Sequence, residues 1–266
     1  MSEMPLGKKL LQPRKYDPLI LFPIPRKTRN IELYGYDLWR AYELIWLNQK
    51  GKPTAGILEI VYPSQSKCIV ESKSLKLYLG GLSYAKFDKK SDVVETIRAD
   101  LGNILHTTWI SVRIIEQDDF AQIINKPHPY GDCLDNLDMP IEVYQRDPDL
   151  LACSQVKTEE TLYTDLFRTN CPITGQPDWA SVEIRYKGNM IHKDALLRYL
   201  CSYRDYQGFA EEICEQIFAD IKNKCSPETI IVKCFYTRRG GIDITPVRCS
   251  RQISIGDIDR TRLIRQ

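Results

Sequence analysis

The sequence has few of the features that mark a disulfide-bonded, metal-binding or membrane protein. It has 266 residues but only three histidines, and its nine cysteines include no C-x-x-C pair. A disulfide framework or a zinc ribbon needs closer cysteine spacing. The histidines His106, His128 and His192 are too far apart in sequence to form a metal-ligand cluster by themselves. No stretch approaches the roughly 18 apolar residues of a membrane helix. We therefore expect reduced thiols and no metal.

An excess of charge of either sign is also missing. The 37 basic and 35 acidic residues leave a formal charge of +2. Because the charges are so nearly balanced, the composition gives no indication of a nucleic-acid or membrane surface. The first 18 residues, MSEMPLGKKLLQPRKYDP, lack the apolar segment of a signal peptide. We expect a soluble cytoplasmic protein that makes no direct contact with nucleic acid or membrane.

Prolines and polar runs divide the chain into three segments. Pro5, Pro13, Pro18, Pro23 and Pro25 predict that residues 1–33 form an extended arm, with order beginning near Tyr34. A mostly polar run at 145–160 then separates residues 34–150 from residues 151–266. Both halves mix strand and helix patterns. We therefore predict an α+β fold with two similar domains.

Hydrophobic periodicity locates the elements within each half. In the first half it predicts strands at 56–62 and 68–71, a helix from about Ser91, and a strand at 109–115. In the second half it predicts a strand at 181–187, helices at 194–206 and 211–222, and a hairpin from 229–237 to 242–247. The segment at 71–78, ESKSLKLY, alternates with polar residues on both faces, which favours a solvated edge strand.

Cys171 is the first candidate for chemistry. It lies in the turn-rich segment NCPITGQPDW, just before a predicted strand, where a side chain can be exposed and rigidly held. Asp178 follows Pro177 and can fold back beside the thiol. The alternative is a small buried hydrophobic residue, which is what most cytosolic cysteines are, and the local pattern alone favours it.

Two other clusters of residues are candidates for binding, one basic and one acidic. Arg238, Arg239, Gly240 and Gly241 combine guanidinium groups with flexible backbone N–H groups, which suits a phosphate, although an ordinary hairpin turn is equally consistent. The acidic pair at 211–212 opens a predicted helix, where the helix dipole explains it. The motifs G-x-G-x-x-G, G-x-x-x-x-G-K-[ST] and H-E-x-x-H are all absent, so no Rossmann fingerprint, P-loop or zincin site is indicated.

Three separated stretches together resemble one known family. ESKSLKLY at 71–78, NCPITGQPDW at 170–179 and YTRRGGIDI at 236–244 resemble the signature regions of NADPH-dependent 7-cyano-7-deazaguanine reductases, the nitrile reductases of queuosine biosynthesis. The similarity runs from about Tyr34 to the C-terminal RLIRQ. It implies two tandem tunnelling-fold domains per chain, with antiparallel sheets and helices on one face, and a homodimer. It also implies reduction of the nitrile to the amine of 7-aminomethyl-7-deazaguanine with two NADPH.

The resemblance also implies a role for each motif residue. Cys171 would attack the nitrile carbon to give a covalent thioimide, and Asp178 would act as general acid toward the nitrile nitrogen. A thiolate adduct protonated at nitrogen has a C=N bond that a hydride can attack, which divides one hard step into easier ones. The residues implied to bind substrate are Val70, Glu71, Ser72, Ala210 and Glu211, and those implied to bind NADPH are Ser72, Lys73, Arg239 and Gly240.

One position departs from the family pattern. Where the family has Phe-His-Glu, this chain has Phe209, Ala210 and Glu211. An alanine side chain cannot donate, accept or relay a proton, and it leaves a hole about the size of an imidazole. An engineered substitution is the explanation we favour, with a natural variant as the alternative. We expect weakened substrate binding or turnover in a retained fold.

Three other functions compete with the reductase. A cyclohydrolase of the same fold also recognises a base through glutamate, but such enzymes commonly need histidine and cysteine metal ligands, and the histidines here are scattered. A catalytically silent protein that only holds a deazaguanine is favoured by Ala210. A nucleophilic cysteine hydrolase is weaker, because Cys171 lacks a histidine partner in the sequence.

Overall fold

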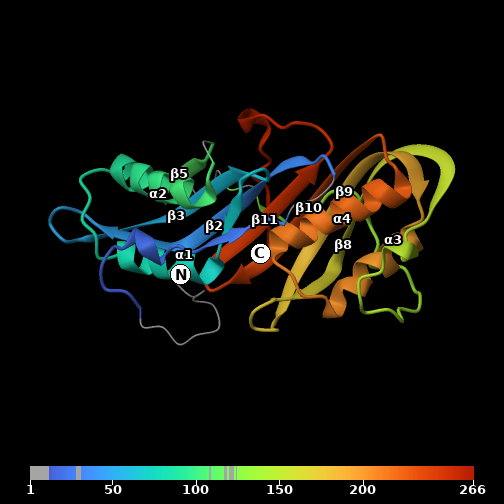
Figure 1. Cartoon of the computed structure of the whole chain (residues 1–266), viewed down its shortest axis with the longest axis horizontal. Coiled ribbons are helices and arrows are strands. Elements are labelled where there is room, and N and C mark those ends of the chain that lie inside the picture. Colours follow the sequence, from blue (N-terminus) through green and yellow to red (C-terminus); the bar gives the residue numbers. More distant parts are fainter. Residues whose placement is uncertain (1–11, 28–30, 108, 117–118, 120–122, 124) are drawn as a thin grey trace. The chain divides into compact units, whose positions relative to one another are not determined.

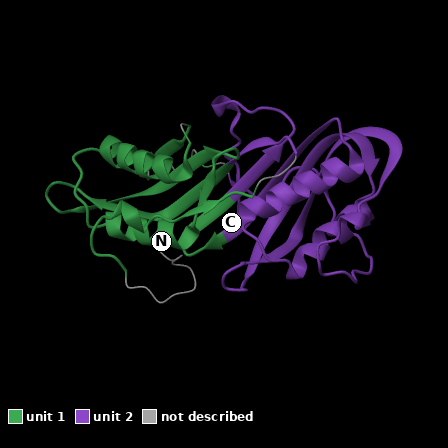
Figure 2. Ribbon diagram, viewed as in Figure 1, with its two compact units in different colours: residues 1–28, 37–123, 238–244 green, residues 29–36, 124–237, 245–266 purple. Residues whose placement is uncertain are grey.

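The computed structural model describes residues 12–27, 31–107, 109–116, 119, 123 and 125–266, and the chain divides into two compact units (Figures 1 and 2). Unit 1 comprises residues 1–28, 37–123 and 238–244, and unit 2 comprises residues 29–36, 124–237 and 245–266. Strands β2 (Tyr34–Leu47) and β11 (Ile242–Cys249) supply residues to both units. The ends of the predicted arm, at 1–11 and 28–30, lie outside the described residues.

Unit 1 is built on antiparallel strands in the order β5-β3-β2. Its other elements are η1 (Pro18–Ile20), β1 (Pro23–Pro25), β3 (Pro53–Pro63), β4 (Cys68–Val70), α1 (Ser72–Leu82), α2 (Lys90–Leu105) and β5 (Ser111–Ile115). β3 pairs antiparallel with β5, and β1 pairs antiparallel with β4. Alternate residues of β3 enter one core with the apolar faces of α1 and α2, so both helices cover the same layer of strands.

Unit 2 has strands in the order β11-β10-β9-β8-β7. Its strands are β6 (Asn125–Lys126), β7 (Asp132–Cys133), β8 (Cys153–Asn170), β9 (Pro177–Ile191), β10 (Thr229–Arg239) and β12 (Arg262–Leu263). Its helices are η3 (Pro148–Leu150), α3 (Lys193–Cys201), η4 (Ser202–Asp205), α4 (Ala210–Cys225) and η5 (Ile255–Asp257). β8, β9 and β10 pair antiparallel, whereas the two-residue strands β7 and β6 pair parallel with β8 and β12.

The core of unit 2 lies between its sheet and its two long helices. Val182, Ile184 and Tyr186 of β9 are buried in it, as the alternation at 181–187 predicted. Leu196 and Leu200 of α3 belong to the same cluster. The apolar residues of α4 follow helical spacing and complete the core. The predicted α+β class, with antiparallel strands and helices packed on them, is confirmed.

The edge-strand prediction for residues 71–78 is wrong, because this segment forms the helix α1. Leu75, Tyr78, Leu79 and Leu82 have the spacing of one helical face and are all buried in the core of unit 1. The alternation seen in the sequence comes from Lys73 and Lys76, which lie outside that apolar face. Burial of the stripe outweighed two glycines at 80 and 81 that disfavour a helix.

The described part of the arm is more ordered than its prolines predicted. Pro23 to Pro25 form β1, so order begins before Tyr34. The hydroxyl of Tyr16 donates to Asp100 Oδ2 at 2.6 Å, and the backbone N–H of Arg26 donates to the Lys67 carbonyl at 3.0 Å. Proline excludes a central strand but not a short edge pairing, which is what β1 makes.

Several properties of the chain follow directly from the structure. All nine cysteines are free thiols. Within the described ranges, no helix is long and apolar enough to cross a membrane. The same residues contain no cluster of three or more histidine, cysteine or acidic side chains placed to hold a metal ion.

Candidate active site

The predicted site residues fall into two groups, one in each unit. Cys171, Asp178, Ala210 and Glu211 belong to unit 2. The residues from 70 to 73, together with Arg239 and Gly240, belong to unit 1. The segments of each group are far apart in the sequence. In unit 2, backbone hydrogen bonds of Asn170 join them, whereas in unit 1 Gly240 lies beside Lys76 of α1 and not beside residues 70–73.

Cys171 occupies the turn between β8 and β9. Its backbone N–H donates to the Gln176 carbonyl at 2.8 Å, and its own carbonyl accepts from the Gly175 N–H at 3.0 Å. Gly175 has a φ of +67°, a conformation that favours glycine. The turn therefore holds the cysteine backbone from both sides. Cys171 is only 9% exposed, so its side chain is buried, as the local sequence pattern by itself favoured.

Asp178 is the second residue of β9 and lies directly opposite Thr169 of β8. Side chains that face each other across an antiparallel pair lie on the same side of the sheet. Asp178 thus lies on the same side as Thr169, which is fully buried, while remaining half-buried itself. The hairpin therefore places the carboxyl group close along the chain to Cys171, as predicted, on a rigid strand and not on a loop.

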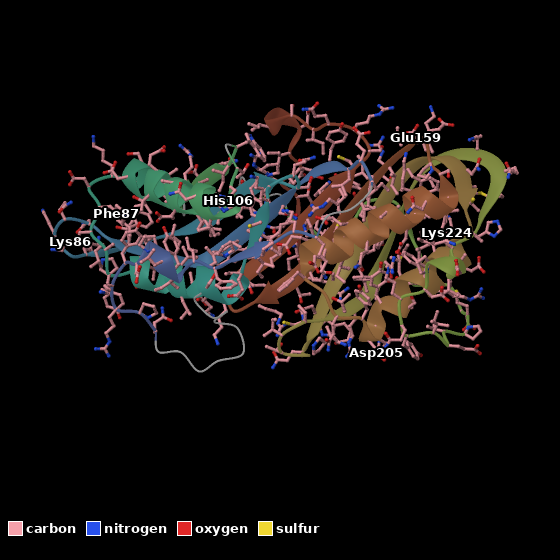
Figure 3. All side chains as sticks on the ribbon, in the orientation of Figure 1. Lys86, Phe87, His106, Glu159, Asp205 and Lys224 are labelled. Carbon is pink, nitrogen blue, oxygen red and sulfur yellow. The ribbon has the colours of Figure 1, made fainter. Side chains whose placement is uncertain are left out.

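The start of α4 is tied to the same hairpin. The backbone N–H of Asn170 donates to the Tyr206 carbonyl at 2.8 Å, and the Gly208 N–H donates to the Asn170 carbonyl at 3.2 Å. The connecting segment begins at Asp205, labelled in Figure 3, and reaches α4 through the N-cap residue Phe209. The N-terminus of this helix therefore lies beside the residue that precedes Cys171. The helix dipole favours negative charge there, including a thiolate.

Ala210 and Glu211 are the first two residues of α4. Ala210 is half-buried and packs against the core of unit 2, whereas Glu211 is only 2% exposed. Carboxylates in the first turn of a helix are favoured by its dipole, but so buried a carboxylate needs strong hydrogen-bond donors as well. A guanine-like edge presents such donors. The structure thus leaves Glu211 well suited to the base-recognition role.

Glu71 caps α1. Its Oε1 accepts from the Lys73 N–H at 2.8 Å, its Oε2 accepts from the Ser74 N–H at 2.7 Å, and its own N–H donates to the Phe22 carbonyl at 2.9 Å. Burial raises the pKa of this carboxyl, and the two backbone N–H bonds partly offset that rise. A carboxylate has about four acceptor sites, so two remain for a ligand. The sequence did not show this capping role, because it predicted a strand here.

Gly240, one of the predicted NADPH-binding residues, lines a pocket of about 230 Å³ in unit 1, whereas Ser72, Lys73 and Arg239 are not among its lining residues. Gly240 and Gly241 form the turn between β10 and β11 with φ values of +58° and +79°, as a two-residue hairpin requires. A side chain at Gly240 would lie within 2.9 Å of Lys76 Nζ, so the bare backbone of the turn and the lysine of α1 meet there. Cations beside exposed backbone N–H groups are a phosphate-binding arrangement.

Lys76 lines this pocket together with Gly240, and the sequence did not single it out. Its helical position explains why. Lys73 and Lys76 are three residues apart and share a face of α1, whereas the strand prediction treated their spacing as alternation. Arg238 lies nearby with its guanidinium 4.6 Å from the centre of the Tyr42 ring. The helical period would have shown the lysine face if the segment had been assigned correctly.

Known proteins match this chain over nearly its whole length. The family model described as "Nitrile reductase, 7-cyano-7-deazaguanine-reductase N-term" matches residues 12–114, and the "QueF-like protein" model matches residues 177–254. A solved structure, the archaeosine synthase QueF-Like in the apo form, matches 38% of this chain and 99% of its own, with a TM-score of 0.33 and 17% identity.

Two curated relatives are much more similar. The NADPH-dependent 7-cyano-7-deazaguanine reductase of Burkholderia ambifaria is 42% identical over 267 residues, which cover 97% of each chain. The protein of the same name from Coxiella burnetii is 43% identical over 91% of this chain and 90% of its own. Identity at this level, over nearly complete chains, leaves no doubt about common descent. The chain belongs to the family of NADPH-dependent 7-cyano-7-deazaguanine reductases.

Proposed function

We propose that this protein reduces the nitrile of 7-cyano-7-deazaguanine to the primary amine of 7-aminomethyl-7-deazaguanine, within tRNA queuosine biosynthesis. The observation that carries the proposal is the β8–β9 turn. It fixes the backbone of Cys171, places Asp178 at the start of the next strand, and ties both to the N-terminus of α4. A nucleophile, an acid and a buried carboxylate are thereby collected on rigid elements, as acid-assisted covalent catalysis requires.

The chemistry proceeds from the sulfur of Cys171. Its thiolate attacks the nitrile carbon, forming a C–S bond and breaking one of the π bonds of the nitrile. Asp178 gives its proton to the nitrogen, so a neutral thioimide results. When bound, two NADPH molecules in turn would supply one hydride each. After the first reduction at the thioimide carbon, the C–S bond breaks, which returns the Cys171 thiolate and leaves a C=N bond. The second hydride and a second proton, taken from solvent, then complete the primary amine.

Substrate recognition falls to the two buried glutamates. Glu71 and Glu211 each present a carboxylate to the N–H donors of the deazaguanine, and the backbone at 70–72 completes the contact. An analogue without those donors would bind more weakly, because it would lose the charge-assisted hydrogen bonds to these buried carboxylates.

The cofactor is held by residues of unit 1. Ser72, Lys73, Arg239 and Gly240 bind NADPH in the proposal. The pocket beside Gly240 supports this because it places Lys76 next to the bare backbone of the 240–241 turn; it also holds Glu43, whose carboxylate lies 3.8 Å from Lys76 Nζ. We propose a homodimer of chains that each contain two tandem tunnelling-fold domains, working in the cytoplasm on a free base and not on nucleic acid. Sedimentation of the purified protein tests the dimer.

Adduct formation tests the function directly. On mixing with 7-cyano-7-deazaguanine and no NADPH, the intact mass is expected to rise by one substrate molecule, together with a thioimide absorbance band. Cys171→Ala is expected to abolish both signals, whereas Cys201→Ala, a half-buried cysteine in the same unit, retains them. Adduct formation by Cys171→Ala would contradict the assignment of the nucleophile. NADPH oxidation that depends on the nitrile then separates a reductase from a silent binding protein.

A silent binding protein is the second candidate, and Ala210 is the observation that favours it. An alanine at the first residue of α4 leaves no proton donor at that position. This candidate predicts tight binding of the deazaguanine without a covalent adduct and without NADPH oxidation, even when Ala210 is replaced by histidine.

A further inference from the structure

Two buried hydroxyl groups lie next to the proposed general acid. Tyr236 is 5% exposed and Thr169 is fully buried. In the described part of the chain, neither hydroxyl makes a hydrogen bond of normal distance and angle, while the Thr169 side chain lies close enough to act on the Tyr236 phenol. Buried polar groups are almost always hydrogen-bonded, so a pair of exceptions at one place needs a physical reason.

The other buried tyrosines of unit 2 show that this is not a general property of the core. The hydroxyl of Tyr199 donates to Asp220 Oδ2 at 2.6 Å, and Tyr203 donates to the same oxygen at 3.3 Å. Tyr186 donates to Glu160 Oε1 at 2.5 Å. Each of these phenols has an acceptor supplied by the fold. Tyr236 occupies the same core and differs from them.

The sheet register places both hydroxyls toward Asp178. Thr169 of β8 lies directly opposite Asp178 of β9, and Tyr236 of β10 lies directly opposite Ala180. Residues 178 and 180 are two positions apart on β9 and therefore point to the same side of the sheet. Thr169, Asp178 and Tyr236 thus share one face across three neighbouring strands.

Electrostatics agree with this placement. Burial raises the pKa of Tyr236 well above its usual value, and the charge of Asp178 adds to the rise, whereas the Thr169 side chain lowers it. The phenol therefore stays protonated at any pH at which the enzyme works. It is a permanent donor, within reach of Thr169 and within the field of Asp178.

We propose that Tyr236 and Thr169 form a hydrogen-bond relay that orients the carboxyl group of Asp178 toward the nitrile nitrogen. The phenol donates to Thr169 Oγ1, and the Thr169 hydroxyl, which is both donor and acceptor, donates to Asp178. Catalytic hydrogen bonds are often long before the substrate binds and tighten in the complex, which accounts for the open geometry. Both are positioning residues, and the inference rests on the function proposed above.

Removing the phenol oxygen alone tests the relay. In Tyr236→Phe, the rate of thioimide formation with 7-cyano-7-deazaguanine is expected to fall at least about tenfold, while the dissociation constant of the initial complex stays within about twofold. The urea midpoint should not fall, because the lost hydroxyl had no partner to lose. A rate equal to that of the wild type would overturn the relay.

Tyr199→Phe is the matched control. It removes the same atom from the same core but breaks a hydrogen bond to Asp220. The urea midpoint of this variant should fall, and its rate of thioimide formation should stay at the wild-type value. If Tyr236 had only a structural role, Tyr236→Phe would also lower the urea midpoint and leave the rate of thioimide formation unchanged. That outcome overturns the inference.

Thr169 supplies an independent variant if Tyr236→Phe fails to fold. Thr169→Val removes the hydroxyl and keeps the shape, so it is expected to slow thioimide formation as much as Tyr236→Phe. Thr169→Ser restores the hydroxyl and is expected to restore the rate. Slow formation in both Thr169 variants, or in neither, overturns the relay.

The wild type distinguishes failure of the function from failure of the relay. If the wild type itself forms no adduct, the proposed function fails and the relay fails with it. If the wild type forms the adduct quickly and Tyr236→Phe does so equally quickly, only the relay is rejected.

Discussion

At the scale of single residues, backbone hydrogen bonds hold the candidate nucleophile Cys171 in place. Both peptide groups of Cys171 are engaged in the β8–β9 turn, and the preceding residue, Asn170, is clamped by Tyr206 and Gly208. The sulfur therefore has little positional freedom. A nucleophile fixed in this way loses little entropy on reaching the transition state, which is where positioning contributes to the rate.

Ala210 gives a prediction at this scale. Ala210→His is expected to raise kcat/KM for nitrile reduction by at least about tenfold, because an imidazole at the start of α4 restores a proton donor beside the substrate. Steady-state NADPH oxidation measures it. No change in nitrile reduction would show that the position has no part in the reaction.

A second variant at the same position separates chemistry from packing. Ala210→Leu fills a comparable volume without a proton to transfer. If leucine raises kcat/KM as much as histidine does, the gain comes from closing the hole beside the substrate and not from proton transfer.

At the scale of elements, the beginning of α1 carries two functions in one residue. Glu71 accepts two backbone N–H groups of the first turn. The Ser74 hydroxyl accepts from the Phe22 N–H at 3.0 Å and donates to the Glu71 carbonyl at 2.7 Å. The helix start, the described arm and the proposed base-recognition carboxylate are thus parts of one hydrogen-bonded unit. Folding of this helix end and formation of the substrate site are the same event.

This double role predicts different outcomes for two substitutions. Glu71→Ala is expected to lower the free energy of unfolding by about 1 kcal/mol through loss of the cap, whereas Glu71→Asp keeps most of it, because aspartate is a good N-cap. Both variants should bind substrate more weakly. Urea unfolding and a binding titration measure the two effects separately.

The control for this pair is Glu95→Ala on the exposed face of α2, where the glutamate side chain is 64% exposed. An exposed ion pair contributes little, so the unfolding free energy should change by less than about 0.5 kcal/mol. Equal urea midpoints for Glu71→Ala and the wild type would show that the cap does not stabilise the helix.

At the scale of the whole molecule, both units bury groups that must stay protonated. Burial is the largest cause of the raised pKa of Tyr78 in unit 1 and of Tyr199 in unit 2, and it raises the pKa of Cys225 to about 12. In the unfolded chain a thiol titrates near 8.5 and a phenol near 10. When folding raises the pKa of a group, the contribution of that group to stability is fully present below its pKa in the unfolded chain. The contribution is lost as the pH rises toward its pKa in the folded protein.

The expected outcome is alkaline unfolding. The urea midpoint should be constant from pH 7 to about 8.5 and fall steadily between about pH 9 and 12. Each titrating group removes ~1.4 kcal/mol of unfolding free energy for every unit by which its folded and unfolded pKa values differ. Cys225→Ala should lose less stability than the wild type between about pH 9 and 10, where thiols titrate in the unfolded chain before most phenols do. Tyr84→Phe, at a tyrosine that is 52% exposed, is the control and should leave the profile unchanged. A flat wild-type profile up to pH 12 would contradict the prediction.

Local pattern by itself was enough to determine several parts of this protein. The alternation at 181–187 and the helical spacing at 211–222 correspond to buried faces of β9 and α4, because each pattern depends only on neighbours along the chain. The glycine pair at 240–241 gives a hairpin for the same reason. Three short motifs were also sufficient to indicate the family and, through it, the reductase.

Only the tertiary structure decided the rest, because long-range contacts set it. The segment at 71–78 becomes a helix through burial of its apolar stripe and the cap from Glu71, and β8 extends over a polar stretch because it pairs with β9 along its length. The sequence could not show that Thr169 and Tyr236 share a face with Asp178, since strand register brings together residues almost 70 positions apart.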